Sequence, residues 1–351
     1  MKVLYLTKYS RLGASSRLRS FQYFPFLKEE GINVSVSPLF NDAYLEALYN
    51  GKKSLRTVFF AYLKRFVVLF SVFKYDKVVI EKELFPYFPA FFELFLSLFG
   101  VCYIVDYDDA IFHNYDLSNN KMIRFFLSNK IGIVMKNAEN VVAGNEYLAE
   151  KARVSGAKNV VIIPTVIDIS RYDTVQLRDR EKIVVGWIGS PSTFKYVKNI
   201  FPVFEELAKH YPIEVHIVGA NEDVPVSFPV QFIKWAEYTE VDSIAAFDIG
   251  IMPLENSCWE KGKCAYKLIQ YMACGLPVVA SPVGMNREVV LNGINGYLAD
   301  TEALWYAFLE ELLKNPAKCS IFGSEGIRLV ERHYTVQVQL QQVLDVLTMK
   351  K

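Results

Sequence analysis

The chain has almost no surplus of charge and few of the residues that build disulfides or metal sites. Its 351 residues carry 39 Lys and Arg against 38 Asp and Glu, a formal net charge of +1. Without a chain-wide positive field, a nucleic-acid partner is not expected, and any basic site must be local. The five cysteines are odd in number and form no CxxC pair. They favour buried thiols in a reducing compartment over a disulfide framework or a zinc site.

The sequence also lacks an uninterrupted apolar run of membrane-spanning length and a recognisable signal peptide. The chain begins directly with a short apolar run, and no small-residue cleavage site follows it. The most apolar stretch, residues 54–73, contains Arg56, Lys64 and Arg65. Each of these would cost about 2.5–3.5 kcal/mol at the centre of a bilayer. We therefore expect a cytoplasmic protein without a transmembrane helix.

What the sequence does contain is a regular alternation of short β-rich apolar runs and helical patterns. Continuous apolar strands separated by helices are typical of parallel sheets that are covered on both faces. Twelve runs fit this description: 3–7, 32–36, 77–81, 102–107, 140–144, 160–164, 183–189, 214–219, 230–235, 248–254, 277–281 and 296–300. Twelve strands are many for one sheet, so the sequence predicts an α/β protein with two doubly wound domains in tandem.

A polar stretch near the middle of the chain sets the domain boundaries. We predict a first domain over 1–167, a linker over 168–182 and a second domain over 183–330. The last residues, 331–351, are expected to form a helix, and the pattern does not indicate where it packs. Because ligands of such sheets bind beyond the carboxyl ends of the strands, a central cleft between the two domains is the expected site.

One predicted helix start carries more positive charge than a helix N-terminus favours. The spacing predicts a helix over 263–274, with a buried face at helical intervals. That face consists of Cys264, Ala265, Leu268, Ile269, Met272 and Ala273. A second stripe on the same helix consists of Lys263, Lys267, Gln270 and Cys274, and Lys261 lies just before it.

Lysines at this end oppose the helix dipole, whereas an anion is favoured there by the dipole and by the free N–H groups. A bound diphosphate would explain lysines at the start of residues 263–274. The alternative is a solvated basic patch that Glu260 partly offsets.

The segment KGKCAYKLIQYMACGLPVVASPVGMNREVVLNGINGYLAD (261–300) resembles the donor-binding segment of family 4 glycosyltransferases. The similarity extends to VVGWIGS, IVG, ENVVAGNEYLAE and IIPTVID, and it covers most of the chain. The resemblance implies the GT-B fold, in which two Rossmann-like domains face a central cleft. It also implies a nucleotide-diphosphate sugar as donor, transfer with retention, and neither a metal nor another cofactor.

The resemblance also has departures at the positions that contact the donor. In the family, two glutamates eight positions apart contact the donor, and Gly262 and Gln270 stand at those positions here. Gln270 can still hydrogen-bond a ribose hydroxyl as donor and acceptor. Glu288 matches a glutamate of relatives and is expected to line the donor pocket with Asn286; the alternative for Glu288 is a helix-capping role.

Many family members carry an arginine directly after the glycine of the first strand in the second domain, and it contacts the diphosphate. Here Ser190 follows Gly189, and Lys195 is the nearest lysine. We expect Lys263 and Lys267 to supply the missing charge, with Gly189, Ser190 and Lys195 close to the donor.

Two segments of the first domain are candidates for the acceptor side. The loop after the first strand carries Gly13 and Arg17, which are expected to approach the acceptor or a donor phosphate. The alternative is an ordinary turn beside a solvated helix face. At the end of the fourth strand, Asp106, Asp108 and Asp109 stand where β-propensity disfavours aspartate.

We expect Asp108 and Asp109 to contact acceptor hydroxyls, with His113 as a candidate proton acceptor. The alternatives are an exposed loop histidine and a cation held by the acidic cluster, although no suitably spaced third ligand supports a metal site.

Residues 51–75 contain six Lys or Arg and no Asp or Glu, and apolar side chains recur there at helical spacing. Such a helix suits the surface of an anionic membrane, as a lipid-linked acceptor would require. The alternative, which the sequence favours slightly, is a core helix with a basic outer face that packs beside residues 88–100.

The favoured hypothesis is a glycosyltransferase that acts on a glycan or lipid-linked acceptor in cell-surface polysaccharide or glycoconjugate synthesis, in the cytoplasm or peripherally on the inner face of the membrane. One alternative keeps the fold but changes the chemistry to that of a sugar-nucleotide epimerase or hydrolase. Another is a non-catalytic partner in glycan assembly, which the missing glutamates favour and the added lysines disfavour.

Overall fold

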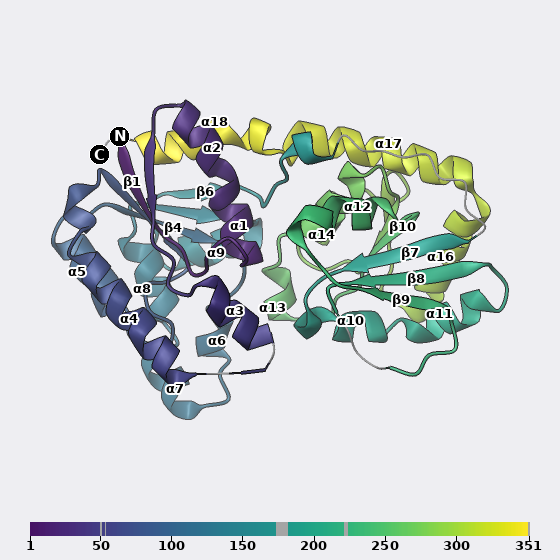
Figure 1. Ribbon diagram of the computed structural model, residues 1–351, viewed down its shortest axis with the longest axis horizontal. Coiled ribbons are helices and arrows are strands. Elements are labelled where there is room, and N and C mark those ends of the chain that lie inside the picture. Colours follow the sequence, from purple (N-terminus) through teal and green to yellow (C-terminus); the bar gives the residue numbers. More distant parts are fainter. Residues whose placement is uncertain (50, 53, 173–181, 221–223, 350–351) are drawn as a thin grey trace. The chain divides into compact units, whose positions relative to one another are not determined.

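The computed structural model describes residues 1–49, 51–52, 54–172, 182–220 and 224–349 (Figure 1). All twelve predicted strands are present, and each lies within two residues of its predicted bounds. They are β1 (Lys2–Leu6), β2 (Asn33–Val36), β3 (Lys77–Glu81), β4 (Tyr103–Tyr107), β5 (Asn140–Ala143), β6 (Val160–Ile162), β7 (Ile183–Ile188), β8 (Ile213–Val218), β9 (Val230–Ile233), β10 (Ile249–Met252), β11 (Val278–Ala280) and β12 (Gly296–Leu298). They form two six-stranded parallel sheets with helices on their faces, which confirms the predicted pair of doubly wound α/β domains.

The chain divides into two compact units. The first unit consists of Met1–Thr165, Gly262–Cys264 and Gln339–Lys351, and the second consists of Val166–Lys261 and Ala265–Val338. The predicted linker 168–182 begins with a short 3₁₀ turn, and its residues 173–181 lie outside the described residues.

The sheet of the first unit has the strand order β2-β1-β3-β4-β5-β6. Strand order reverses between β1 and β3, and the carboxyl ends of strands beside such a reversal are the usual ligand site of a doubly wound sheet. The helices before β6 are α1 (Ala14–Arg19), α2 (Phe24–Glu29), α3 (Asp42–Tyr49), α4 (Leu55–Leu69), α5 (Phe91–Leu98), α6 (His113–Asp116), α7 (Lys121–Leu127), α8 (Lys130–Asn137) and α9 (Glu146–Val154).

The sheet of the second unit has the strand order β12-β11-β10-β7-β8-β9, so its reversal lies between β7 and β10. Alternate side chains of β7 and β8 pack with α11 and α16 in one apolar core. Most residues between them are buried as well, so both faces of the sheet are covered. The remaining helices are α10 (Lys195–Lys198), α11 (Phe201–Ala208), α12 (Glu240–Ala245), α13 (Cys258–Lys261), α14 (Tyr266–Ala273), α15 (Asn286–Val289), α16 (Glu302–Lys314), α17 (Pro316–His333) and α18 (Val336–Thr348).

The helix predicted over 263–274 starts later than expected. It begins at Tyr266, because Ala265 adopts a left-handed backbone with φ of 49° and so breaks the helical path. Lys263 therefore does not share a helical stripe with Lys267, and that part of the prediction was wrong. The predicted buried side chains are all buried, and Gly275 ends the helix with a φ of 70°.

Candidate functional site

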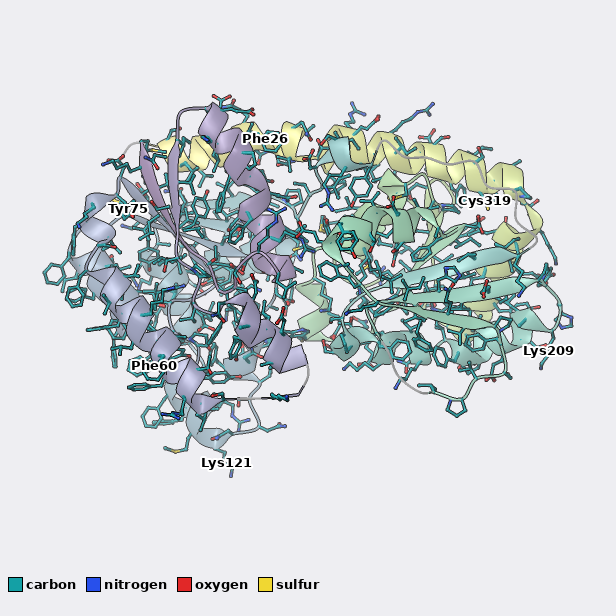
Figure 2. All side chains as sticks on the ribbon, viewed as in Figure 1. Phe26, Phe60, Tyr75, Lys121, Lys209 and Cys319 are labelled. Atoms are coloured by element: carbon teal, nitrogen blue, oxygen red, sulfur yellow. The ribbon has the colours of Figure 1, made fainter. Side chains whose placement is uncertain are left out.

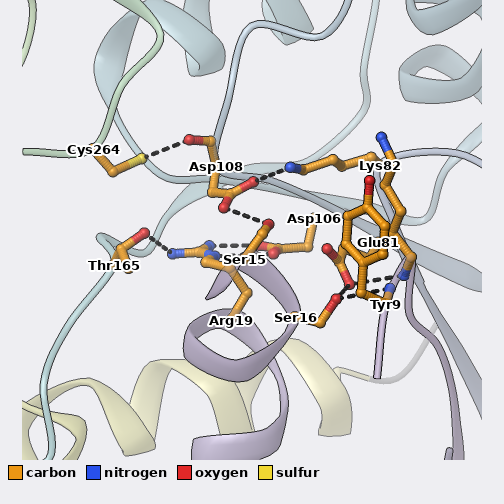
Figure 3. A network of polar contacts seen from close by, with 11 residues as sticks. Tyr9, Ser15, Ser16, Arg19, Glu81, Lys82, Asp106, Asp108, Thr165 and Cys264 are labelled. Atoms are coloured by element: carbon orange, nitrogen blue, oxygen red, sulfur yellow. Dashed lines mark hydrogen bonds and ion pairs between the residues drawn. The ribbon is translucent and has the colours of Figure 1, made fainter. Parts of the chain in front are cut away.

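A cluster of charged side chains lies at the carboxyl ends of β1, β3 and β4 in the first unit (Figure 3). These three strands are neighbours in the sheet and flank its reversal point. The cluster combines residues that end the strands with residues of α1. Burying so many charges is unfavourable unless they are paired, so their partners decide what each side chain can do.

Asp106, in β4, is held by Arg19 of α1. Nε of Arg19 donates to one carboxylate oxygen at 2.9 Å and Nη2 to the other at 2.5 Å. Nη1 of Arg19 also donates to the carbonyl oxygen of Ile163 at 2.7 Å. Burial alone would lower the pKa of Arg19, but the Asp106 carboxylate raises it above its ordinary value. Burial raises the pKa of Asp106, and the Arg19 guanidinium opposes that shift. The bidentate pair fastens α1 to the strand ends.

Asp108 is held by groups from two other elements. Its carboxylate lies 2.8 Å from Nζ of Lys82 and accepts a hydrogen bond from Oγ of Ser15 at 2.5 Å. Burial would raise the pKa of Asp108, but Lys82 and Ser15 outweigh it and lower the pKa to about 2. Lys82 has a left-handed backbone with φ of 66°. Such a conformation costs about 1–3 kcal/mol and is found mostly at functional sites.

Asp109 has one carboxylate oxygen that is buried without a hydrogen-bond partner among the described residues, as does Glu81. The corresponding oxygen of Asp108 is paired with Lys82. Burial raises the pKa of Asp109, and Lys263 and Lys82 oppose that shift. A buried carboxylate oxygen with spare accepting capacity is rare in a settled core and suits a hydroxyl ligand. Asp109, which follows the end of β4, is thus a candidate contact for a hydroxyl ligand.

The low pKa of Asp108 leads to a prediction about stability. Its folded pKa of about 2 lies below the usual aspartate value. The carboxylate therefore stabilises the fold fully above the unfolded pKa, and the contribution of about 2 kcal/mol is lost as pH falls through the folded pKa.

We expect the free energy of unfolding to differ between the wild type and Asp108→Asn at neutral pH, and this gap to narrow as pH falls from about 6 to 3. Chemical denaturation at several pH values measures it. The exposed Asp345→Asn, also in the first unit, is the matched control; a gap for Asp108→Asn that is constant with pH would contradict the assignment.

The other first-unit candidates have structural partners. Gly13 precedes α1, and a β-carbon there would lie 2.4 Å from Cβ of Tyr9. Arg17 is buried, and its Nη1 donates to the carbonyl oxygen of Leu12 at 3.5 Å. His113 lies in α6 rather than in a loop, with Nδ1 2.8 Å from Asp116 and Nε2 2.9 Å from the hydroxyl of Tyr147. Both ring nitrogens are engaged, so catalysis by His113 stays a prediction with little geometric support.

The loop 262–264 packs on this cluster within the first unit. Sγ of Cys264 contacts the carbonyl oxygen of Asp108 at 3.2 Å, and Nδ2 of Asn145 donates to the carbonyl oxygen of Lys263 at 3.0 Å. A β-carbon on Gly262 would lie 2.7 Å from the backbone nitrogen of Ala110. Gly262 therefore has no room for the glutamate that relatives carry at this position.

Gly262→Ala is expected to destabilise the fold by about 1–3 kcal/mol, because backbone atoms of Ala110 cannot move aside as a side chain can. Thermal unfolding measures the loss. Gly132→Ala is the matched control, since the atom closest to its β-carbon is Oδ1 of the Asn129 side chain, which can rotate away. Equal melting temperatures for wild type and Gly262→Ala would show that the loop is not tightly packed.

In the second unit, Lys267 lies at the point where strand order reverses. A β-carbon built on Gly189, directly after β7, would lie 2.7 Å from Nζ of Lys267. The same ammonium lies 4.6 Å from the ring centroid of Trp187, a cation–π contact. Gly219 follows β8 and has a φ of 86°. A β-carbon built on Gly219 would lie 2.3 Å from the carbonyl oxygen of Gly189, so the two backbones approach closely. The N–H groups of both glycines donate to carbonyl oxygens of the sheet, Gly189 to Val218 and Gly219 to Ile233. The Lys267 ammonium beside these glycines is therefore the group that suits a phosphate.

Gln270 was predicted to line up with the lysines, but it is buried. Its Nε2 donates to Oε1 of Glu240 at 3.0 Å and to the hydroxyl of Tyr172 at 3.3 Å. The other oxygen of Glu240 accepts a hydrogen bond from Nε1 of Trp235 at 2.7 Å. A carboxylate is thus present beside residue 270, although the chain supplies it from α12. Glu260, which was considered as a partial counter-charge for the lysines, accepts hydrogen bonds from Tyr196 and Ser257. Its carboxylate is thus engaged by these two hydroxyls.

The other residues predicted to contact the sugar donor differ in how exposed they are. Ser190 is exposed, and its Oγ lies 3.0 Å from Oγ of Ser192. Lys195 is exposed at the start of α10. Asn286 is buried and donates to the carbonyl oxygen of Ser281 at 3.0 Å. Glu288 is exposed in the first turn of α15, so its capping alternative is compatible with its position.

Arg19 and Lys82 were missed by sequence reasoning. A signal for Lys82 was available, since the charged run after β3 stands at a strand end just as the aspartates after β4 do. Arg19 had no such signal, because two arginines lie in one short helix and only packing decides which of them meets Asp106.

Within the described segments, no group of three or more His, Cys, Asp or Glu side chains is arranged to hold a metal ion. In the same segments, no helix combines the length and the apolar character that crossing a membrane would require.

Comparison with known proteins places this geometry in context. Residues 182–315 match the family model for Glycosyl transferases group 1. An uncharacterised glycosyltransferase of Methanocaldococcus jannaschii is 25% identical over 197 residues. That match covers 50% of this chain and 49% of the archaeal protein, so it spans about half the length of each. The second half of the chain is therefore similar in sequence to group 1 glycosyltransferases.

Solved structures extend the similarity of fold to the whole chain. HepE of Anabaena in complex with UDP-glucose has a TM-score of 0.73 at 15% identity, with 99% of each chain covered. WaaG, a glycosyltransferase involved in lipopolysaccharide biosynthesis, has a TM-score of 0.72 at 13% identity, with 100% of each chain covered. At such identities the likeness establishes the GT-B fold.

Proposed function

We propose that this protein is a glycosyltransferase that moves a sugar from a nucleotide-diphosphate sugar to a glycan or lipid-linked acceptor. Retention at the anomeric carbon, independence of metals and a role in cell-surface polysaccharide or glycoconjugate synthesis are part of this proposal. So is a cytoplasmic location, peripheral on the inner face of the membrane. The observation that carries it is the Lys267 ammonium beside Gly189, within the segment related to group 1 glycosyltransferases.

The donor chemistry follows from charge. When the bond between the sugar and the diphosphate breaks, negative charge grows on the departing phosphate. Lys267, whose ammonium lies beside Gly189, neutralises that charge without any reorganisation of solvent. In this proposal the lysine takes the part that a metal ion plays in other phosphate sites. Lys263, Lys195, Ser190, Asn286 and Glu288 stay candidate donor contacts.

On the acceptor side, Asp109 accepts a hydrogen bond from the hydroxyl that attacks the sugar. Asp108 and Asp106 act through their own partners, since Lys82, Ser15 and Arg19 already bind their carboxylates. These residues are positioning groups that hold the β4 end rigid, and rigid positioning of a reacting hydroxyl is a large part of catalysis by transferases.

A thermal-shift panel tests the donor half of the proposal. UDP, UDP-glucose, GDP and GDP-mannose are each added to the full chain, beginning with the uridine compounds because the HepE crystals hold UDP-glucose. A matching nucleotide sugar at 100 times its Kd should stabilise the fold by about 2.7 kcal/mol. Glucose 1-phosphate, which lacks the nucleoside, is the control. Stabilisation by no member of a full nucleotide panel would count heavily against the proposal.

The reaction itself separates the proposed transferase from the two alternatives. A transferase releases nucleotide from the stabilising donor only when an acceptor is added. An epimerase or hydrolase turns the donor over without an acceptor, and a non-catalytic partner is not stabilised by nucleotides. Nucleotide release measured with and without a membrane glycolipid extract distinguishes the three.

A further inference from the structure

Helices α4 and α5 of the first unit each bury one charged residue and expose many of their apolar ones. Arg65 of α4 is 1% exposed, and its Nη2 donates to the carbonyl oxygens of Thr7 at 2.7 Å and Ser37 at 3.0 Å. Glu93 of α5 is also 1% exposed and accepts a hydrogen bond from the backbone nitrogen of Leu84 at 2.9 Å. A surface helix of a water-soluble domain normally shows the reverse arrangement.

The outward side chains of α4 form a continuous apolar stripe. Phe59, Leu63, Phe66 and Phe70 follow one another at intervals of four, three and four residues, and Phe60 and Val67 widen the stripe. All six are exposed, including Phe60 at 61%. Figure 2 shows Phe60 on the outer side of α4, away from the sheet of this unit.

Helix α5 presents a second apolar stripe. Phe91, Leu94, Phe95 and Leu98 recur at intervals of three, one and three residues, and Leu98 is 82% exposed. The rings of Phe66 and Phe92 lie 5.8 Å apart and join the two helices. We call the exposed apolar side chains of α4 and α5, with Phe70 and Phe99, the aromatic face. A contiguous face of this kind marks an interaction site rather than ordinary surface.

Among the described residues of 51–75, the exposed charges all have one sign. Lys52, Arg56, Lys64 and Lys74 are exposed in or beside α4. The only acidic residue within α4 and α5 is the buried Glu93. Apolar aromatic side chains flanked by cations are the composition of helices that lie in the interface of an anionic bilayer.

From these observations we propose that the aromatic face docks the protein onto an anionic lipid membrane, with α4 and α5 lying in its interface. Neither helix can cross a bilayer, because they have 15 and 8 residues and about 20 are needed. A second copy of the chain is a poorer occupant, since a symmetric contact would bring the same cations together without acidic partners. This proposal stands on the composition of the face and does not depend on the proposed activity.

Vesicle flotation of the full chain tests the docking. Vesicles contain equal parts of phosphatidylglycerol and phosphatidylcholine, or phosphatidylcholine alone. We expect the wild type to float with the anionic vesicles and to float less as salt rises. The double variant Phe60→Ser/Phe95→Ser should bind more than tenfold more weakly, and Arg56→Gln/Lys64→Gln should lose about fivefold per charge.

Matched controls are available at exposed positions outside the aromatic face. Ile321→Ser of α17 controls for loss of an exposed apolar side chain, and Lys28→Gln of α2 controls for loss of an exposed charge in the same unit. Both should float as the wild type does. The proposal is overturned if the wild type does not float with anionic vesicles, or if the phenylalanine variant floats equally well. Dimerisation in sedimentation velocity that the same variant abolishes, without any flotation of the wild type, would assign the face to a second copy.

Fluorescence quenching tests the same docking without removing an aromatic side chain from the face. All four tryptophans, Trp187, Trp235, Trp259 and Trp305, lie in the second unit. Phe60→Trp therefore adds a reporter to the aromatic face, and vesicles with brominated acyl chains should quench its fluorescence. Tyr238→Trp, at an exposed position of the second unit, is the control and should not gain quenching. Equal quenching of the two variants would refute docking through this face.

Discussion

Lys267→Ala is expected to lower kcat/KM for sugar transfer by about 10²–10³-fold. Removal of one preorganised hydrogen-bond donor has an effect of this size at other sites where negative charge develops in the transition state. The Lys267 ammonium lies at the Gly189 turn and over the ring of Trp187, so both its position and its charge are fixed before a donor arrives. Affinity for the free nucleotide diphosphate should fall about 10–100-fold, because a charged hydrogen bond is lost. Titration calorimetry and initial rates measure the two effects.

Two further variants separate charge from packing. Lys267→Met keeps an apolar stem beside Trp187 and removes only the charge, so it should be nearly as defective as the alanine variant. Lys314→Ala is the matched control, since Nζ of Lys314 also lies over an aromatic ring, 5.7 Å from the centroid of Tyr211, but on the outer helix α16. Unchanged nucleotide affinity and rate in Lys267→Ala would remove Lys267 from the donor site.

The strands could be predicted from the sequence because each is buried on both faces. A strand in such a sheet is apolar at every position, so its signal is local and does not depend on its neighbours. The strand order could not be read in the same way. The same alternation of strands and helices is compatible with different orders of six parallel strands. Only the structure shows that the strand order reverses between β1 and β3 in the first sheet and between β7 and β10 in the second.

The donor segment shows where local patterns stop being informative. Cys264 and Ala265 are buried at helical spacing, yet both precede the helix, because burial alone does not reveal the left-handed backbone of Ala265. The partners of Gln270 are Glu240 and Tyr172, which lie 30 and 98 positions away in the sequence. No local rule links residues so far apart. The resemblance identified position 270 as important, whereas its burial and its partner carboxylate required the fold.

Residues 51–75 illustrate a third limit. Periodicity predicted a helix with an apolar stripe, and it favoured packing of that stripe in the core. The structure corrects this, because the side of α4 with Arg65 faces inward and the phenylalanine stripe faces outward. A sequence pattern gives the spacing of a stripe but not the face that the rest of the domain covers. Burial of Arg65 depends on two carbonyl oxygens that distant residues supply.

The second large effect is expected at Asp109. Asp109→Asn should lower kcat by about 10²–10⁴-fold, the range lost when a group that transfers or orients a proton is removed. The variant keeps the size of the side chain but removes the charge that attracts the acceptor hydroxyl. Binding of the donor should change little, since its predicted contacts other than Lys263 lie in the second unit. The nucleotide-dependent thermal shift of Asp109→Asn should therefore match that of the wild type.

The pH profile distinguishes a direct part for Asp109 from a merely structural one. Because burial raises its pKa, the carboxylate is protonated, and activity is lost, at a higher pH than an ordinary aspartate would require. In the wild type, kcat should thus fall on the acidic side at a pH above the usual range of aspartate pKa values. This acidic fall should be absent from the residual activity of Asp109→Asn. Asp345→Asn, an exposed change in the same unit, should keep the wild-type profile. An acidic fall that persists in Asp109→Asn would assign proton transfer to another group, and His113, held between Asp116 and Tyr147, would then be the residue to replace next.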